Sequence, residues 1–277
     1  MQTSYGFYDQ EPQEDLWWAP HVKDFAALSP LKDPVRSLNR NQSTESPEIK
    51  HATVCVAPSL NVPQYLLWLQ HWAERLGVRV IKARLPVSEG LDAALREAER
   101  RVTWVGERKG DLYLNATGLG AAKLCGDESM YPIRGQTVLV KGEAVATRTR
   151  SGEAYTSYCI PRPGSGTTIL GGTKDKGNWS ETPDAAITAE ILERAAVLAP
   201  ELLTGADGGF EVVSVQVGLR PGREGGPRME GEVVGGRRVV HAYGHASGGY
   251  QNSVGSARMV VRLVGESLGD VGVRARL

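Results

Sequence analysis

The segment Val239-Val-His-Ala-Tyr-Gly-His-Ala-Ser-Gly-Gly-Tyr-Gln251 is the most informative stretch of this chain for its fold. Residues 238–243 read as a strand, and a turn with three glycines leads from that strand into a helix. Apolar residues recur on this helix at helical spacing, and we expect them to face inward: Val254, Ala257, Val261, Val264 and Leu268. A strand, a glycine-rich turn and a helix together direct backbone N–H groups at an anionic or electron-rich ligand atom. The segment therefore predicts a backbone cradle for a ligand.

The two histidines of this segment do not indicate a metal site. His241 and His245 are four residues apart, but the glycine between them and the loop context keep them off one helix face. A third ligand is not found nearby in the sequence, although a metal site would need one. No metal site is predicted, and His245 is more typical of a supporting or surface residue than of a catalyst.

Two further turns carry weaker signals. Thr117-Gly118-Leu-Gly120 follows an expected strand, and on its own it is best interpreted as a tight turn. In Gly218-Leu-Arg-Pro-Gly222 an arginine enters a Gly/Pro turn, where it suits bidentate capture of a carboxylate. The alternative, which this turn alone slightly favours, is a surface arginine paired with an acid such as Glu224.

Hydrophobic periodicity predicts a mixed α/β chain in which α/β and β-rich parts are interwoven. Residues 1–50 read as an irregular lead-in that ends in a mobile loop. Helices are expected at residues 65–76, at 91–101 as a charged surface helix, and at 187–198; Pro and Gly residues mark the ends of the first and the third. Strands are expected at residues 51–56, 78–81, 111–115, 138–141, 157–160, 210–217 and 238–243.

The composition excludes several classes of function. The 277 residues carry 32 basic and 32 acidic side chains, so bulk electrostatics does not call for nucleic acid or a membrane surface. Apolar runs fall far short of the roughly 20 residues of a membrane-spanning helix, and the first residues do not resemble a secretion signal. Three cysteines without C-x-x-C spacing indicate neither a disulfide framework nor a zinc site and favour a reducing intracellular setting.

Taken together, several segments carry a resemblance to a known family. They are Asp111-Leu-Tyr-Leu-Asn-Ala-Thr-Gly-Leu-Gly120, Pro132-Ile-Arg-Gly-Gln-Thr-Val-Leu-Val140, Val217-Gly-Leu-Arg-Pro221, and the His241-Ala-Tyr-Gly-His stretch to Gln251. Tyr158-Cys-Ile-Pro-Arg-Pro163 and Gly171-Gly-Thr-Lys-Asp-Lys-Gly-Asn-Trp179 follow the same order and spacing. As a set these motifs resemble the FAD-dependent D-amino-acid oxidase family, especially its fungal members. The resemblance runs from about Tyr5 to the last helix.

The resemblance implies a role for individual residues. Arg220 resembles the arginine that binds the substrate carboxylate, and Tyr158 resembles the tyrosine whose hydroxyl completes that grip. Ser247, through its carbonyl, and Gln251 resemble the groups that orient the substrate amine. The residues that resemble the lining of the flavin site are Asn115, Thr117, Gly118, Arg134, Gly135, Gln136, Gly244, Ser247, Gly248, Gly249, Tyr250 and Gln251.

The resemblance also implies the cofactor, the reaction and the division of the chain. FAD would accept a hydride from the α-carbon of a D-amino acid, giving a 2-oxo acid and ammonia, and O2 would become hydrogen peroxide. Residues 1–277 would form one oxidase-like region with a mixed α/β fold. Within it, residues from about 130 to 235 would form an antiparallel β-rich substrate-binding part. Residues 51–120 and 236–270 would form an incomplete, Rossmann-like FAD-binding part.

Two departures from the family pattern leave alternatives open. The sequence lacks a strand followed by a G-x-G-x-x-G turn, the motif that binds the FAD pyrophosphate. One hypothesis is therefore an incomplete gene model or a truncated relic that binds FAD poorly or not at all, acting at most as a binding protein. Lys174 stands where fungal relatives often have a tyrosine, and with Arg148 and Arg150 it could favour an acidic substrate, as in D-aspartate oxidases. Solvated loop charges are the favoured interpretation of these cations.

The C-terminal Ala275-Arg276-Leu277 resembles the Ser-Lys-Leu type of peroxisomal signal. An enzyme that makes hydrogen peroxide belongs beside catalase, so we expect recognition by the peroxisomal import receptor, or a cytoplasmic location if the tripeptide is not read. The sequence does not determine whether the protein forms a homodimer. A relative acting on glycine or sarcosine is disfavoured by Gly218-Leu-Arg-Pro221 together with the Tyr-Gly-His loop.

Overall fold

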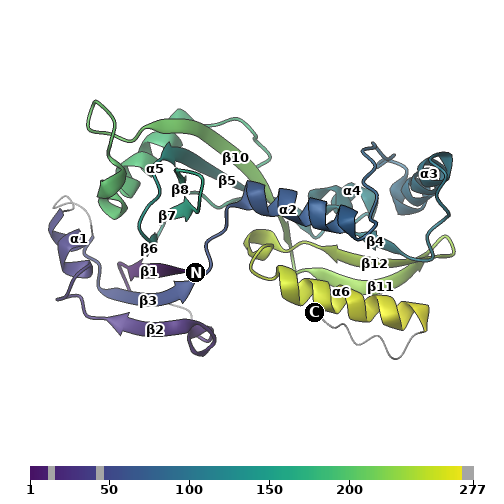
Figure 1. The fold of residues 1–277 in the computed structure, drawn as a ribbon, viewed down its shortest axis with the longest axis horizontal. Coiled ribbons are helices and arrows are strands. Elements are labelled where there is room, and N and C mark those ends of the chain that lie inside the picture. Colours follow the sequence, from purple (N-terminus) through teal and green to yellow (C-terminus); the bar gives the residue numbers. More distant parts are fainter. Residues whose placement is uncertain (12–15, 42–46, 270–277) are drawn as a thin grey trace. The chain divides into compact units, whose positions relative to one another are not determined.

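The computed structural model describes residues 1–11, 16–41 and 47–269 (Figure 1). Contacts divide the chain into two compact units. Unit 1 contains Met1–Val80, Gly135–Lys174 and Glu181–Gly218, and unit 2 contains Ile81–Arg134, Asp175–Ser180 and Leu219–Leu277. The functional division expected from the sequence is not tested by this grouping and stays a prediction, and Ala275–Leu277 lies outside the described residues.

A long mixed sheet forms the framework of unit 1, although β9 and residues 130–134 of β5 and 219–223 of β10 are grouped with unit 2. Its strands follow the order β10-β5-β8-β7-β6-β1-β3-β2, with β9 also paired to β5. Neighbouring strands are antiparallel where their register is known, except that β1 and β6 are parallel. The bounds are β1 Gln2–Tyr8, β2 Lys23–Leu28, β3 His51–Ala57, β5 Met130–Lys141, β6 Thr147–Ser151, β7 Thr156–Arg162, β8 Thr167–Gly171, β9 Asp175–Lys176 and β10 Val212–Arg223.

One helix covers part of this sheet and forms the main core of unit 1. Helix α5 (Ala185–Leu198) packs on β7 and β8 (Figure 1). The helix begins where the Asp184 side chain accepts hydrogen bonds from the first helical N–H groups. Burial alternates strictly along β7, as expected for a strand with one face against a helix. The core residues under α5 include Val138, Cys159, Leu170, Ile191 and Ala195. Helix α1 (Val35–Asn41) and the first strands enclose a second cluster around Phe7 and Ile49.

Unit 2 is built on a three-stranded sheet in the order β11-β12-β4. The strands are β4 Tyr113–Asn115, β11 Arg228–Val234 and β12 Arg237–Tyr243; β11 and β12 are antiparallel, and β12 and β4 are parallel. Helix α6 (Ser253–Leu268) runs along β11 and β12 (Figure 1). Helix α3 (Gly90–Trp104) and the short α4 (Ala121–Leu124) pack near β4, and two turns of 3-10 helix, η2 (Gly118–Gly120) and η4 (Ala246–Gly248), flank the sheet.

Most expected elements are confirmed, and the mixed α/β fold is correct. Helix α2 (Val62–Arg75) has Pro63 in its first turn and ends before Gly77, and the other expected strands and helices all form, apart from one strand. The exception is residues 78–81, which form no strand: Val78 and Val80 are 52% and 61% exposed, and within the described residues no neighbouring strand pairs with them. An apolar run becomes a strand only where a partner completes its hydrogen bonds.

Three other expectations need correction. The described part of residues 1–50 is not irregular, because β1 pairs with β3 and β6 and β2 pairs with β3; the mobile loop expected at its end falls largely on residues 42–46, outside the described residues. The helix expected on the surface, α3, buries Leu91, Ala94 and Leu95 under the sheet of unit 2. On α6, Val254, Ala257 and Leu268 are exposed and do not face inward, because the covered positions of this helix lie mainly between residues 260 and 267. Among the described helices, none is long and apolar enough to cross a membrane.

Candidate functional site

Asn115 organises a turn at the end of β4, which we call the Asn115 turn (residues 115–118). Its side chain is buried, and its Oδ1 accepts hydrogen bonds from the Thr117 backbone N–H at 3.3 Å and from the Thr117 hydroxyl at 2.7 Å. Gly118 has a φ of +56°, a conformation that favours glycine. A Cβ at Gly118 would lie 3.9 Å from the Pro221 side chain, so the turn lies against this residue.

Arg220 therefore stands one residue from the place where the Asn115 turn packs. It lies near the end of β10 and is half-buried. Glu224, the acid considered as its partner, forms an ion pair with Lys176, which also lies 4.3 Å above the Tyr131 ring. Gly222 is buried against that tyrosine ring and leaves no room for a side chain. The end of β10 is thus held firmly in unit 2.

The third predicted segment, the glycine loop (residues 244–251), follows β12. Gly244 has a φ of +87°, and a Cβ there would meet the Arg223 side chain at 2.8 Å. Ala246 has the positive φ of +49° that is unusual for alanine. His245 Nε2 lies 2.9 Å from the Ser256 hydroxyl, which ties the loop to α6. Unit 2 therefore brings together the Asn115 turn, the segment around Arg220 and the beginning of the glycine loop.

The outer part of the glycine loop is open to solvent. Its exposed members are Ser247, Gly249, Tyr250 and Gln251, and Gly248 is half-buried. A cavity of about 360 Å³ lies beside the loop, lined by residues that include His245, Gln251, Gly255 and Met259. The cap residue of α6, Asn252, forms no side-chain hydrogen bond with the first helical turn. The loop therefore presents exposed backbone at the positive end of a helix dipole.

Tyr158 lies in unit 1, on β7. It is paired across the sheet with Gly171, and its ring covers the backbone of Gly171 and Gly172. A Cβ at Gly171 would overlap the ring carbons, and one at Gly172 would lie 2.7 Å from the tyrosine hydroxyl oxygen. These two glycines therefore define the position of the Tyr158 side chain.

Two predicted cofactor residues of β5 have side chains that hold other parts of the fold. Gln136 is fully buried; its side chain donates to the Asp184 carbonyl at 2.7 Å and accepts from the Asp184 N–H at 2.8 Å. The Arg134 Nε donates to the Ser180 carbonyl at 3.0 Å, and its side chain is buried. Gly135, between them, is buried as well. Contact with a cofactor by these three residues stays a prediction.

The arginines considered for an acidic substrate form ion pairs inside unit 1. Arg150 is bound to Asp9, with 2.8 Å between Nε and Oδ1 and with 7% and 4% of the two side chains exposed. Arg148 is paired with Glu201 at 2.6 Å. Neither is the solvated loop charge that the sequence suggested. Lys174, by contrast, is exposed.

Sequence reasoning missed a group of polar residues behind the glycine loop. Asp127 Oδ2 accepts hydrogen bonds from Arg223 Nε and from the hydroxyl of Tyr243, both at 2.9 Å. Burial alone would raise the pKa of Asp127, but these hydrogen bonds together lower it. Burial and the Arg228 guanidinium, which donates to the Tyr243 hydroxyl at 3.1 Å, act in opposite directions on Tyr243, whose pKa rises to about 12. Only the position of Tyr243 in the glycine-rich segment could have indicated this group.

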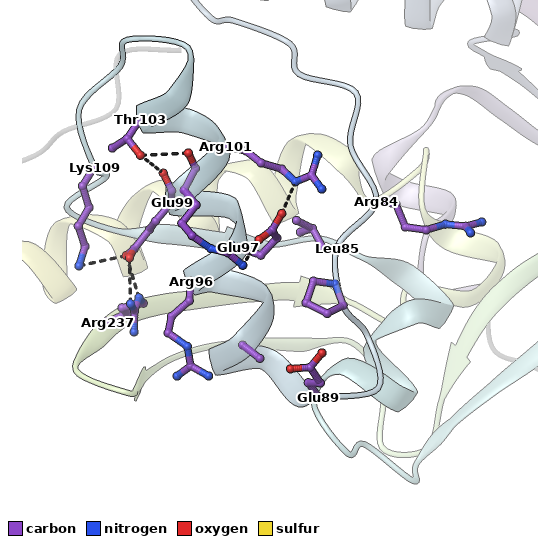
Figure 2. A pocket seen from close by; sticks show the side chains of 13 residues that line it. Arg84, Leu85, Glu89, Arg96, Glu97, Glu99, Arg101, Thr103, Lys109 and Arg237 are labelled. Carbon is purple, nitrogen blue, oxygen red and sulfur yellow. Dashed lines mark hydrogen bonds and ion pairs between the residues drawn. The ribbon is translucent and has the colours of Figure 1, made fainter.

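A separate cavity of about 950 Å³ lies along α3 (Figure 2). Its charged side chains mostly bind one another: Arg101 pairs with Glu97, while Arg237 and Lys109 pair with Glu99. The hydrogen bond from Arg237 is the main cause that lowers the pKa of Glu99 to about 2. None of the predicted site residues lines this cavity. Because these charged side chains already form ion pairs with one another, the composition of the cavity lining does not indicate a ligand.

Residues 7–263 match the family described as FAD dependent oxidoreductase. The chain belongs to this family. The match covers all three converging segments of unit 2 and the strand that carries Tyr158. It therefore confirms the resemblance that the sequence motifs indicated.

Similar proteins agree with this assignment. The chain is 37% identical over 221 residues to a D-amino-acid oxidase of Fusarium vanettenii, covering 76% of this chain and 57% of that protein. It is 34% identical over 259 residues to the D-amino-acid oxidase of Schizosaccharomyces pombe, covering 90% and 67%. A human D-aspartate oxidase is 30% identical, covering 95% and 69%. The chain thus spans between about half and about two thirds of the length of these curated relatives.

A solved structure shares the fold. Glycine oxidase from Geobacillus kaustophilus superposes with a TM-score of 0.67 at 20% sequence identity, covering 96% of this chain and 71% of that one. At this identity the similarity shows the fold alone. The mixed α/β architecture of this chain is therefore shared with that glycine oxidase.

The geometry of unit 2 fits the cofactor of this family. A flavin has carbonyl oxygens along its pyrimidine edge, which need N–H donors at close approach. The glycine loop has no side chain at Gly248 and Gly249, and a Cβ at Gly249 would meet nothing within 4 Å. The adjoining α6 N-terminus supplies N–H groups without a side-chain cap. If FAD binds, the Asn115 turn and the glycine loop are the elements of unit 2 that would hold it.

Proposed function

We propose that this chain carries the substrate pocket of a D-amino-acid oxidase, which converts D-amino acids to 2-oxo acids with FAD and O2. The observation that carries the proposal is that the Asn115 turn, the segment around Arg220 and the beginning of the glycine loop lie together in unit 2. Gly118 lies against Pro221, next to Arg220, and Gly244 lies against Arg223. A cation for the substrate carboxylate and a glycine loop suited to a flavin are therefore held by the same small sheet.

In this proposal the protein binds and orients, and no side chain needs to act as an acid or base. Arg220 binds the substrate carboxylate. A second donor to that carboxylate, the hydroxyl of Tyr158, is proposed from the family resemblance alone. The Ser247 carbonyl and Gln251 accept and orient the amine. Holding both ends of the amino acid fixes the α-carbon at the near-attack distance of roughly 3 to 3.5 Å from the acceptor atom.

When bound, FAD would supply the acceptor for the hydride of the α-carbon and pass both electrons to O2, giving hydrogen peroxide. The remaining imine would be hydrolysed to the 2-oxo acid and ammonia. Because hydrogen peroxide is harmful outside a catalase-rich compartment, we propose that Ala275-Arg276-Leu277 directs the protein to the peroxisome. If the tripeptide is not read, the location is the cytoplasm, and a homodimer stays a possibility for testing.

The ion pairs of unit 1 favour a neutral substrate over an acidic one. An acidic side chain would need a cation that is not already compensated. Arg150 and Arg148 are bound to Asp9 and Glu201, so they have little positive charge to offer. Of the three cations considered, only the exposed Lys174 is then left to bind an acidic substrate side chain, as a D-aspartate oxidase activity would require.

The test is the visible spectrum of the purified chain with added FAD, followed by D-alanine without oxygen. The proposal expects a bound flavin spectrum that bleaches on D-alanine, and faster than on D-aspartate. Arg220→Met should abolish bleaching, whereas Arg258→Met, which removes an exposed arginine of α6, should not.

Two outcomes would overturn the proposal. A protein that never binds FAD would mean that this chain is catalytically inactive by itself and acts at most as a binding protein or as a fragment of a longer enzyme. A bound flavin that glycine or sarcosine bleaches, but D-alanine does not, would assign a different substrate. The targeting proposal is tested separately, because a fluorescent fusion should leave the peroxisome when the last three residues are deleted.

A further inference from the structure

His241 is a buried titratable residue that the proposed chemistry does not use. It lies on the central strand β12 and is completely buried. Across one side of the sheet it is paired in register with Asn115, and its Nδ1 lies 3.0 Å from the Asn115 Nδ2. On the other side its Nε2 lies 3.1 Å from the Glu232 Oε1. The imidazole therefore connects a carboxylate of β11 to the residue that forms the Asn115 turn.

Hydrogen-bond chemistry determines which nitrogen of His241 carries the proton. The backbone N–H of Thr117 can only donate, so the Asn115 atom that accepts from it must be Oδ1. The Asn115 amide group then points its NH2 toward the imidazole and also lies 3.1 Å from the Cys125 Sγ. An NH2 group needs an acceptor, so Nδ1 of His241 must be unprotonated. The proton of the neutral ring is consequently on Nε2, facing Glu232.

The surroundings keep this ring neutral. Burial and the Arg228 guanidinium lower the pKa of His241, while Glu232 and Glu230 oppose this shift. The Glu232 contact is close but is not aligned as a good hydrogen bond. It therefore offsets only part of the lowering of the His241 pKa. A protonated ring would also set two donors against each other at Asn115. The charged or titratable groups around the ring are Arg228, Glu230 and Glu232 of β11, Tyr243 of β12, Cys125 after α4, and Glu266 of α6, which shares a cavity with Glu232.

We propose that His241 is a positioning residue, which acts as the neutral Nε2–H tautomer to hold the Asn115 amide and, through it, the Thr117–Gly118 peptide against Pro221. This role rests on the proposed function, because the Asn115 turn is the segment expected to contact FAD. The chain of contacts runs from Glu232 to His241, Asn115 and Thr117. This chain of contacts ends beside Arg220. A change in the tautomer or position of the imidazole would therefore displace both the turn expected to contact the cofactor and the segment expected to bind the substrate.

Two substitutions separate positioning from packing. In His241→Asn the amide oxygen can replace Nδ1 and accept from Asn115, but the contact with Glu232 is lost. In His241→Gln the longer side chain reaches toward Glu232 and leaves the Asn115 NH2 without its acceptor. Both remove an imidazole from the same buried place and lose its packing, and His241→Gln should lower stability further because the buried Asn115 NH2 is left without an acceptor. Only the second should disturb the Asn115 turn.

The first readout does not require FAD. Nitrogen-15 NMR of histidine-labelled protein resolves the tautomer of each of the five histidines, and the His241→Asn spectrum assigns the signal of interest. The proposal expects a neutral Nε2–H ring whose titration lies below the ordinary histidine pKa of about 6.5. The Thr117 amide resonance should move in His241→Gln and stay in place in His241→Asn. An Nδ1–H tautomer, or equal movement in both variants, would overturn the proposal.

The second readout links the inference to the cofactor. With added FAD, the Kd measured by flavin fluorescence should rise about tenfold or more in His241→Gln, because a buried amide loses its partner, and by less than about threefold in His241→Asn. Equal Kd values in the two variants would contradict the positioning role. If wild-type protein binds no FAD, the proposed function fails, but the tautomer and the Thr117 resonance still decide the role of His241.

Discussion

The buried ion pair between Asp9 and Arg150 offers a sharp test of the structure of unit 1. The Arg150 Nε donates to the Asp9 Oδ1 at 2.8 Å, and the hydroxyl of Tyr155 donates to Oδ2 at 2.6 Å. Arg150 also donates to the Pro47 carbonyl. With 7% and 4% of the two charged side chains exposed, neither can recover its hydration if the other is removed. Asp9→Ala therefore leaves a buried guanidinium and a half-buried phenol without their shared acceptor.

Removing one partner of a buried ion pair costs about 3–5 kcal/mol, and we expect Asp9→Ala to lose this much unfolding free energy. The double variant Asp9→Ala/Arg150→Met should recover most of the loss, since it removes the uncompensated charge. The matched control is the exposed pair of Lys141 and Glu211, which has the same kind of contact at 2.6 Å but side chains 64% and 40% exposed. Glu211→Ala should cost less than about 1 kcal/mol.

Urea unfolding followed by circular dichroism measures all four proteins under the same conditions. The reasoning would be refuted if Asp9→Ala cost no more than Glu211→Ala. It would also be refuted if the double variant were as unstable as Asp9→Ala, because the loss would then come from packing. The same double variant tests specificity: the ratio of D-alanine to D-aspartate turnover should not change if Arg150 is only structural.

Three further predictions follow from the described contacts. Gly171→Ala should push the ring of Tyr158 aside and lower kcat/KM for D-alanine about tenfold or more in steady-state assays, whereas an unchanged value would show that this ring is not needed. Because the pKa of His241 is lowered in the folded protein, this histidine takes up a proton in the unfolded chain before it does so in the folded chain as the pH falls below about 6.5. The unfolding free energy should therefore drop by up to about 1.4 kcal/mol per pH unit below that pH. Urea titrations of His241→Gln should lack this contribution. Burial raises the pKa of Cys159 to about 12, so a thiol reagent at pH 8 should label it only after unfolding, and rapid labelling of the native protein, seen by mass spectrometry, would contradict its place in the core.

Local sequence was sufficient for elements whose signals lie within one short segment. Helix α2 has Pro63 in its first turn and ends before Gly77, as the backbone preferences of these two residues predict. The apolar residues of α5 repeat at helical spacing, and its three core positions, Ile191, Ala195 and Leu198, are buried. The glycine-rich segment after β12 also indicated a turn and a helix, because only glycine accepts the φ of +87° found at Gly244.

The sequence by itself therefore determined the fold class, most helices and strands, and the family. Tertiary structure alone decided whether an apolar run became a strand: β1 and β2 form because β3 lies beside them, whereas residues 78–81 join no strand of the described part of the chain. It also decided how polar residues are used, because His241 meets Asn115 across 126 residues and Arg150 meets Asp9 across 141. Such contacts depend on which strands become neighbours. A charge is therefore a solvated loop residue or half of a buried pair according to what the distant chain places opposite it.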